Sequence, residues 1–397
     1  MKNYQPHYMS MLLLMFVCIA SCSNETTSGP GFEIGGTPAE SVYQIPSDRK
    51  VLLPGTGFQT GDIVRLTDTG ISHNTYRVEA AVEDDGAVIT LPGNFVDGRY
   101  ELFIVRGTRQ VRYGLAVFRA DSDRPGELDR PDYDRLTADR HPRLLMDDEA
   151  FGSLMEQVRA GNNQVLNRLH ATNLRNADIY GLAAAPLAYQ LDAAEKRILH
   201  ISNAALLRIF SCAYAYRATG DRKYLDHAEN DINTVCNFPD WNGHRHYLDV
   251  GEMAAAVALG YDWLYADLKP ETRANAERAL REYAFDTAEP YGSSFYNKVS
   301  NWNQVCNAGL VCGALAVYET CPETAEAIIE KSLESNRTAV EALYAPHGNY
   351  PEGYGYWEYG TVFEVLMLTA LETAAGSDAG ISATAGFDRT AEWLLYM

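Results

Sequence analysis

The chain has 397 residues, a formal net charge of −20, an apolar share of 46% and an aromatic share of 11%. This composition is typical of a folded protein with enough apolar surface for more than one core, and it excludes global disorder. The acidic balance, without a basic patch or stripe, argues against binding of a nucleic acid through bulk electrostatics.

Residues 1–22 have the pattern of an export signal. Lys2 precedes an apolar run from Met9 to Ala20, which is too short to span a membrane. The segment Ile19-Ala20-Ser21-Cys22 resembles a bacterial lipobox, whose cysteine is acylated after cleavage, and a polar tether follows at residues 23–31. We therefore expect an exported protein that is lipid-anchored through Cys22 to a bacterial membrane, on its periplasmic or cell-surface side. An ordinary cleaved signal peptide is the alternative.

The remaining cysteines would face an oxidising compartment. Their number is odd and their surroundings are apolar and helix-like, which favours buried small side chains over a disulfide framework, with a single bridge as the alternative. These residues are Cys212, Cys236, Cys306, Cys312 and Cys321.

Short runs in which apolar and polar residues alternate fill residues 32–120, as in DIVRLTD and RYELFIVRG. Turn signals such as DDG and VDG separate the runs, and this period of two predicts a small antiparallel β-sandwich. The segment GTGFQTGD resembles the immunoglobulin-like modules found at the front of exported bacterial enzymes. Residues 121–140 are rich in proline and in charges of both signs, which predicts a linker.

From residue 141 to residue 397 the apolar period is helical. Gly220 followed by Asp221 is typical of one helix that closes and a next helix that is capped. Very apolar helices alternate with more charged ones, which suits an (α/α) barrel or a superhelical array, and the lack of a fixed sequence period favours the barrel. The expected helices lie near residues 148–159, 201–219, 222–236, 251–265, 271–285, 302–318, 325–343 and 356–375.

A first polar motif, SNWNQVCNAG at residues 300–309, interrupts this apolar half. Asn303, Gln304 and Asn307 share one face of the first helical turns and predict a polar mouth. Amides at such a mouth can hydrogen-bond a sugar carboxylate. Alternatively, Ser300 and Asn301 cap the helix and the other amides bind loop backbone.

A second motif, GNYPEGYGYWEYGT at residues 348–361, is rich in aromatic residues. Its glycines permit a tight turn into a helix. Tyr356, Tyr359 and Phe363 have the spacing of a core-facing stripe. A tyrosine hydroxyl nevertheless becomes a general acid or base when nearby groups perturb its pKa.

A third motif is DWNGHRHYLDVGEM at residues 240–253. Asp249 and Glu252 have the spacing of a capping box in front of an apolar helix. No HxxxH or paired CxxC spacing occurs, so the sequence predicts no metal site. The loop before Asp249 holds side chains that can bind an acidic sugar, with solvated histidines as the alternative: Trp241, His244, Arg245 and His246.

In order along the chain, HPRLLMDDE, FPDWNGHRHYLDVGEMAAAVALGYDWLY, NWNQVCNAG and YPEGYGYWEYGT resemble the helical domain of the heparinase II/III-like polysaccharide lyases, which include relatives acting on alginate oligomers. The resemblance implies that residues 141–397 form an incomplete (α/α) toroid. In the family an antiparallel β-sandwich follows and supplies a further catalytic histidine and, in some members, a structural metal ion. The sequence stops before such a domain, so we expect a C-terminally incomplete lyase with little or no turnover.

The chemistry that the resemblance implies is β-elimination at a uronic acid. The enzyme neutralises the carboxylate, a base removes the C5 proton and an acid protonates the departing C4 oxygen. The resemblance makes Tyr356 the catalytic tyrosine and Asn303 the neutralising group, at a position where some relatives carry histidine. It also implies supporting roles in substrate binding or loop orientation for Asn301, Gln304, His246, Glu352, Tyr354 and Tyr359. The expected partner is an acidic polysaccharide or oligosaccharide, and no cofactor is expected in this chain.

Two other functions fit the sequence. An (α/α)-barrel glycoside hydrolase needs two carboxylates beside the scissile bond, and Glu352, Glu358 and Asp249 are available. A non-catalytic, surface-tethered glycan-binding protein would use the aromatic loop as a stacking platform.

Overall fold

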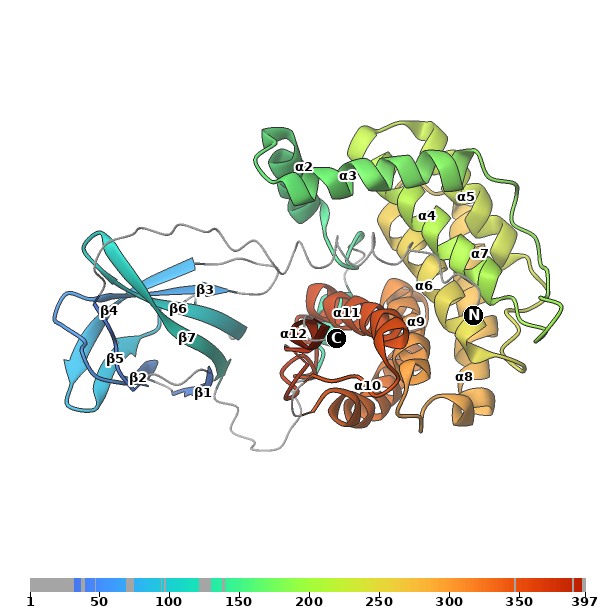
Figure 1. The fold of residues 1–397 in the computed structure, drawn as a ribbon. Coiled ribbons are helices and arrows are strands. Elements are labelled where there is room, and N and C mark those ends of the chain that lie inside the picture. Colours follow the sequence, from blue (N-terminus) through green and yellow to red (C-terminus); the bar gives the residue numbers. More distant parts are fainter. Residues whose placement is uncertain are drawn as a thin grey trace. The chain divides into compact units, whose positions relative to one another are not determined.

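The computed structural model describes residues 32–36, 40–46, 48–68, 75–93, 95, 98–120, 130–137, 140–345, 348–387 and 389–394. The described residues form two compact units, residues 32–120 and residues 130–394 (Figure 1). The expected signal peptide, its Cys22, the tether and most of the linker lie outside the described residues.

The first unit is a seven-stranded sheet in the order β1-β7-β6-β3-β4-β5-β2. All neighbours pair antiparallel except β1 and β7, which are parallel. The expectation of short antiparallel strands in this part of the chain is therefore confirmed. The strands are β1 (Glu40–Ile45), β2 (Lys50–Pro54), β3 (Ile63–Asp68), β4 (Thr75–Glu83), β5 (Gly86–Thr90), β6 (Gly98–Arg106) and β7 (Arg109–Ala120).

The alternating pattern places one face of this sheet in a core. Val64 and Leu66 of β3 are fully buried and pair with Ile104 and Leu102 of β6, while the residues between them are partly exposed. Successive side chains of a strand point to opposite faces, which explains the period of two in the sequence.

The second unit is helical. Its longer helices are α2 (Asp148–Ala160), α3 (Gln164–Asn176), α4 (Leu199–Thr219), α5 (Arg222–Cys236), α6 (Tyr247–Leu264), α7 (Pro270–Ala279), α9 (Asn301–Ala316), α10 (Pro322–Tyr344) and α11 (Tyr354–Ala375). Shorter ones are α8 (Asp286–Tyr291) and α12 (Thr390–Leu394), with single turns η1 (Tyr133–Leu136), η2 (Ala177–Leu182), η3 (Leu280–Phe285), η4 (Gly292–Ser294) and η5 (Tyr318–Thr320).

All eight expected helices are present. Gly220 adopts φ of 72° and the side chain of Asp221 caps α5, as the sequence predicts. The helix expected at residues 271–285 is α7 followed by the π-helical turn η3. Helix α3 was not expected.

Helices α4, α6, α9 and α11 form an inner row. Helix α6 packs between α4 and α9, and α9 packs between α6 and α11. Every residue of α6 is buried, whereas α5 and α10, which pack outside α4 and α9, each have an exposed face. A helix surrounded by protein must be apolar nearly all round, which accounts for the alternation of apolar and charged helices along the chain.

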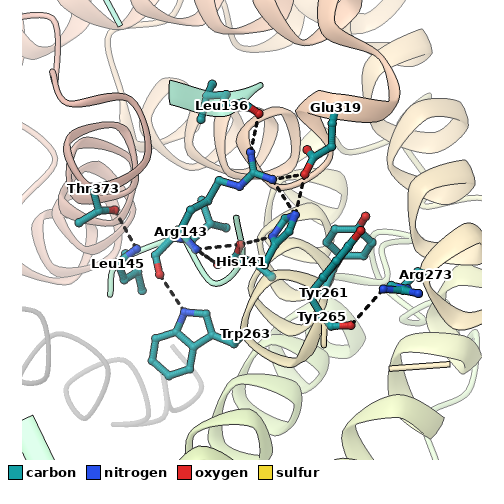
Figure 2. A network of polar contacts seen from close by, with 12 residues as sticks. Leu136, His141, Arg143, Leu145, Tyr261, Trp263, Tyr265, Arg273, Glu319 and Thr373 are labelled. Atoms are coloured by element: carbon teal, nitrogen blue, oxygen red, sulfur yellow. Dashed lines mark hydrogen bonds and ion pairs between the residues drawn. The ribbon is translucent and has the colours of Figure 1, made fainter. Parts of the chain in front are cut away.

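The inner helices run in the same direction, because their starts meet each other and so do their ends. At the starts, Ile198 contacts Asp249, and His246 contacts Trp302. At the ends, the guanidinium of Arg217 lies 4.6 Å from the ring of Trp263. Residues 140–147 also cross these ends, where Leu145 N–H donates to Thr373 of α11 (Figure 2).

Helices α6 and α9 approach each other closely at two glycines. A Cβ on Gly309 would lie 2.0 Å from the backbone oxygen of Gly251, and a Cβ on Gly251 would lie 2.9 Å from the oxygen of Val305. Glycine at both positions therefore sets the distance between the two central helices.

The five cysteines of the helical unit are free thiols, and only Cys321 is partly exposed. The interpretation of these residues as small side chains in apolar surroundings is confirmed for the part of the chain that the structure describes. No helix among the described residues is both long and apolar enough to cross a lipid bilayer.

Candidate functional site

The three polar motifs of the sequence meet where the inner helices begin. We call this region, formed by residues 241–246, 300–304 and 350–356, the N-terminal rim. The starts of α6, α9 and α11 supply its backbone. Helix starts carry unsatisfied N–H groups and a partial positive charge, so polar and acidic side chains are stabilised there.

Glu352 joins two of the motifs. Its Oε2 accepts a hydrogen bond of 2.7 Å from the backbone N–H of Asn301, and its carboxylate accepts from Asn301 Nδ2 at 3.0 and 3.1 Å. Ser300, at the N-cap position, makes no side-chain cap. The cap of α9 therefore comes from a residue 51 positions later, which fixes the Tyr-rich loop against the amide motif.

The amide face of α9 does not form an open mouth, contrary to the expectation. Asn303, Gln304 and Asn307 have no exposed surface. Asn303 Nδ2 donates to Ser335 Oγ of α10 at 2.8 Å and to the carbonyl oxygen of Tyr296 at 3.3 Å. The amide nitrogens point toward α10 and α11, where Ser335 and Glu364 accept from them. A substrate can reach Asn303 only if these helices move. The role of Asn303 as the neutralising group therefore stays a prediction, and the burial of its side chain argues against it.

Gln304 connects the rim to a buried acid. Its Oε1 accepts from Tyr350 OH at 2.6 Å, and its Nε2 donates to Tyr344 OH at 2.8 Å and to Glu364 Oε2 at 3.2 Å. Asn336 Nδ2 donates to the same Glu364 oxygen at 2.8 Å. Burial raises the pKa of Glu364 to about 7, and the two amide donors offset only part of this shift.

Asp249 is not the start of a capping box. Helix α6 begins at Tyr247 with His246 at its N-cap, so Asp249 already lies within the first turn. Its carboxylate instead accepts from Ile198 N–H and Asn242 Nδ2, each at 2.8 Å, and it lies 2.6 Å from His246 Nδ1. His246 is therefore a buried, oriented histidine and not a solvated one, and its ring packs edge-on against Trp302 at 4.8 Å.

Tyr356 and Tyr354 are the exposed aromatic residues of the rim, at 47% and 45% of their surface. Tyr354 stacks on Trp357. Tyr359, one turn further along α11, is buried and its OH donates to Glu252 of α6 at 2.6 Å. The predicted core stripe therefore begins at Tyr359, and Tyr356 is free to meet a solute.

Trp241 and Arg245 differ in accessibility. Trp241 is buried and its Nε1 donates to the carbonyl oxygen of Val235, so it holds the loop. Arg245 is exposed, and its Nε donates to the carbonyl oxygen of Glu195. Arg245 is thus an accessible cation in the loop that leads to His246.

Sequence reasoning missed two partners of these residues. Asn242, which adopts φ of 60°, and Trp302 both hold the His246 region in place. A polar Asn beside a glycine is a turn signal that identifies the first. For Trp302 the sequence gives no indication of this role beyond its position inside the amide motif.

A second polar network lies at the opposite end of the inner helices (Figure 2). His141 Nδ1 lies 2.7 Å from Asp262 and its Nε2 lies 2.8 Å from Glu319, while Arg143 pairs with the same Glu319. Asp262 also accepts the backbone N–H of Leu144 at 2.8 Å. Burial disfavours the His141 cation, but its bonds to Asp262 and Glu319 outweigh burial and raise the pKa of His141 above its ordinary value. This network fastens residues 140–147 across the helix ends.

Among the described residues, no group of three or more His, Cys, Asp or Glu side chains is arranged to hold a metal ion. Comparisons with protein-family models and with curated proteins found no match to this chain.

Proposed function

We propose that this protein is a polysaccharide lyase that cleaves uronic-acid-containing glycans by β-elimination at the N-terminal rim. The observation that carries the proposal is the position of Tyr356. It is a half-exposed phenol on the first turn of α11, directly after the loop that Glu352 ties to α9. The proposal includes an incomplete (α/α) toroid for the helical unit, an immunoglobulin-like sandwich for the sheet unit, and export with a lipid anchor at Cys22.

In this proposal Tyr356 protonates the departing C4 oxygen and, in a syn elimination, also removes the C5 proton. The exposed guanidinium of Arg245 is the accessible cation that can pair with the uronate carboxylate. Glu352 holds the tyrosine loop, and Asn303 supports the start of α9 from the interior.

The test uses the purified chain with alginate, hyaluronan, chondroitin and heparan polymers. Elimination creates a conjugated unsaturated uronate that absorbs ultraviolet light, and hydrolysis does not. We expect ultraviolet-absorbing product, formed slowly, with at least one polymer, and its loss in Tyr356→Phe. Tyr354→Phe is the matched comparison, because this residue has nearly the same exposure on the same turn but a role in substrate binding, so its replacement should change KM and not kcat. Turnover that survives Tyr356→Phe would overturn the assignment.

A glycoside hydrolase is the second candidate, and one observation favours it. Burial raises the pKa of Glu358, two residues after Tyr356, as a general acid of a glycosidase requires. The other candidate carboxylates are occupied, since Glu352 caps α9 and Asp249 binds three donors. New reducing ends without ultraviolet absorbance, abolished by Glu358→Gln, would favour hydrolysis.

A further inference from the structure

Two buried polar atoms of the N-terminal rim have no hydrogen-bond partner among the described residues. They are His246 Nε2 and Asn301 Oδ1. The side chain of His246 is 5% exposed and Asn301 is 3% exposed. Trp302 contacts the His246 ring and directly follows Asn301 in the chain. Buried polar groups nearly always have a partner, so these two atoms point to a ligand.

A carboxylate fixes the orientation of each side chain from behind. Asn301 Nδ2 donates to both oxygens of Glu352. A carboxylate can only accept, so the amide nitrogen faces Glu352 and the amide oxygen faces away from it. In the same manner His246 Nδ1 lies 2.6 Å from a carboxylate oxygen of Asp249, which accepts, so Nδ1 carries a proton and Nε2 faces away from Asp249.

When Nε2 of His246 carries a lone pair, the rim presents two hydrogen-bond acceptors at the starts of α6 and α9, which meet through His246 and Trp302. Two acceptors bind two donors. A uronate carboxylate has no donor and is repelled by the amide oxygen of Asn301, whereas a sugar ring carries several hydroxyl groups. Trp302 is partly exposed and supplies an apolar surface for the ring carbons.

We propose that His246 and Asn301 form a subsite that accepts hydrogen bonds from two hydroxyl groups of a sugar ring packed against Trp302. This inference rests on the proposed function and refines it. The carboxylate of the uronate is bound elsewhere on the rim, and the subsite recognises a ring by its uncharged hydroxyl groups. Both acceptor atoms are buried, so the proposal requires the rim to open at Trp302, the partly exposed side chain that contacts the His246 ring.

The test measures binding by titration calorimetry in the Tyr356→Phe background, so that turnover does not interfere. The probes are mannuronate and hyaluronan tetrasaccharides, each beside its carboxyl-reduced counterpart. His246→Asn removes Nε2 and keeps an amide nitrogen for Asp249, and Asn301→Ala keeps the backbone bond to Glu352. We expect each variant to weaken Kd about tenfold, and by the same factor for the charged and the reduced form of a probe.

Thr373→Ala is the control. It removes the acceptor of the Leu145 N–H at the opposite end of the inner helices, so it lowers stability without touching the rim. The subsite is overturned if the variants weaken binding of the charged probes only. It is also overturned if they lower the melting temperature and leave every Kd unchanged, which is the result expected if a buried water occupies this place. Absence of binding by all four probes overturns it as well.

Failure of the subsite and failure of the lyase proposal are distinguishable. Elimination activity that His246→Asn and Asn301→Ala leave unchanged contradicts the subsite alone. Reduced probes that bind through His246 and Asn301, in a chain that eliminates no uronate polymer, contradict the lyase alone. Nitrogen NMR of His246 gives an independent readout, with Nε2 unprotonated in the free protein and shifted when a tetrasaccharide is added.

Discussion

The carboxylate of Glu352 caps helix α9 through the backbone N–H of Asn301, at 2.7 Å, and binds the side-chain amide of the same residue. One side chain thus closes a helix start and fixes the loop that leads to Tyr356. A charged acceptor at a helix N-terminus is favoured both by the free N–H groups and by the helix dipole.

Replacement of Glu352 by alanine is expected to cost about 2 kcal/mol of unfolding free energy, since it removes charge-assisted hydrogen bonds at a half-buried site. It should also abolish any turnover, because the Tyr-rich loop loses its attachment to α9. Urea denaturation and the ultraviolet assay measure the two effects. Asn301→Ala, which retains the backbone bond, should lose less stability, and equal losses in the two variants would contradict the capping role.

The raised pKa of Glu364 predicts that the protein becomes less stable as the pH rises. Its folded pKa of about 7 exceeds the ordinary value of 4.5, so the folded state binds a proton that the unfolded state has released. Unfolding free energy should therefore decrease between about pH 4.5 and pH 7 and then level off, by about 3 kcal/mol in total. Glu364→Gln mimics the protonated acid and should flatten this window in urea denaturation at a series of pH values. An unchanged pH slope in this variant would show that Glu364 is not the titrating group.

His141 predicts a second loss of stability at higher pH. Its folded pKa is raised, so its contribution is complete below the unfolded value, about 6.5, and is lost as pH rises through the folded pKa. His141→Gln should remove this window and leave the Glu364 window in place. Thermal unfolding at a series of pH values between 6 and 9 measures this pH dependence. If His141→Gln keeps the pH dependence of the natural chain, the network in Figure 2 does not explain it.

The sequence predicts the helices well where local signals decide. Helix α5 has its expected bounds because Gly220 closes α4 and Asp221 caps the next helix. Helix α3 was not predicted because few of its side chains are buried, and some of these, including Asn173, are polar. The strands were visible because one face of the sheet is a core.

The site was harder to predict because its geometry depends on neighbouring helices. The spacing of Asp249 and Glu252 suits a capping box and a pair of core-facing acids equally well, and only the start of α6 at Tyr247 decides between them. The direction of Asn303 depends on Ser335 of α10, which no local pattern reveals. The sequence motifs predict where the rim lies, but tertiary packing determines which of its side chains are exposed to solvent.

The crossing of α6 and α9 predicts a large difference between two glycine-to-alanine substitutions. A Cβ on Gly309 would lie 2.0 Å from the backbone oxygen of Gly251, so the central helices must separate, which costs about 3 kcal/mol or more. Gly152 is an exposed residue in the middle of α2, and nothing lies within 4 Å of a Cβ placed on it. Gly152→Ala should therefore raise the free energy of unfolding by about 0.5–1 kcal/mol. Urea denaturation measures both. If Gly309→Ala does not fold, Gly251→Ala, with its nearest contact at 2.9 Å, gives a milder test of the same crossing. A Gly309→Ala or Gly251→Ala variant as stable as the natural chain would mean that the two helices are not in contact at these residues.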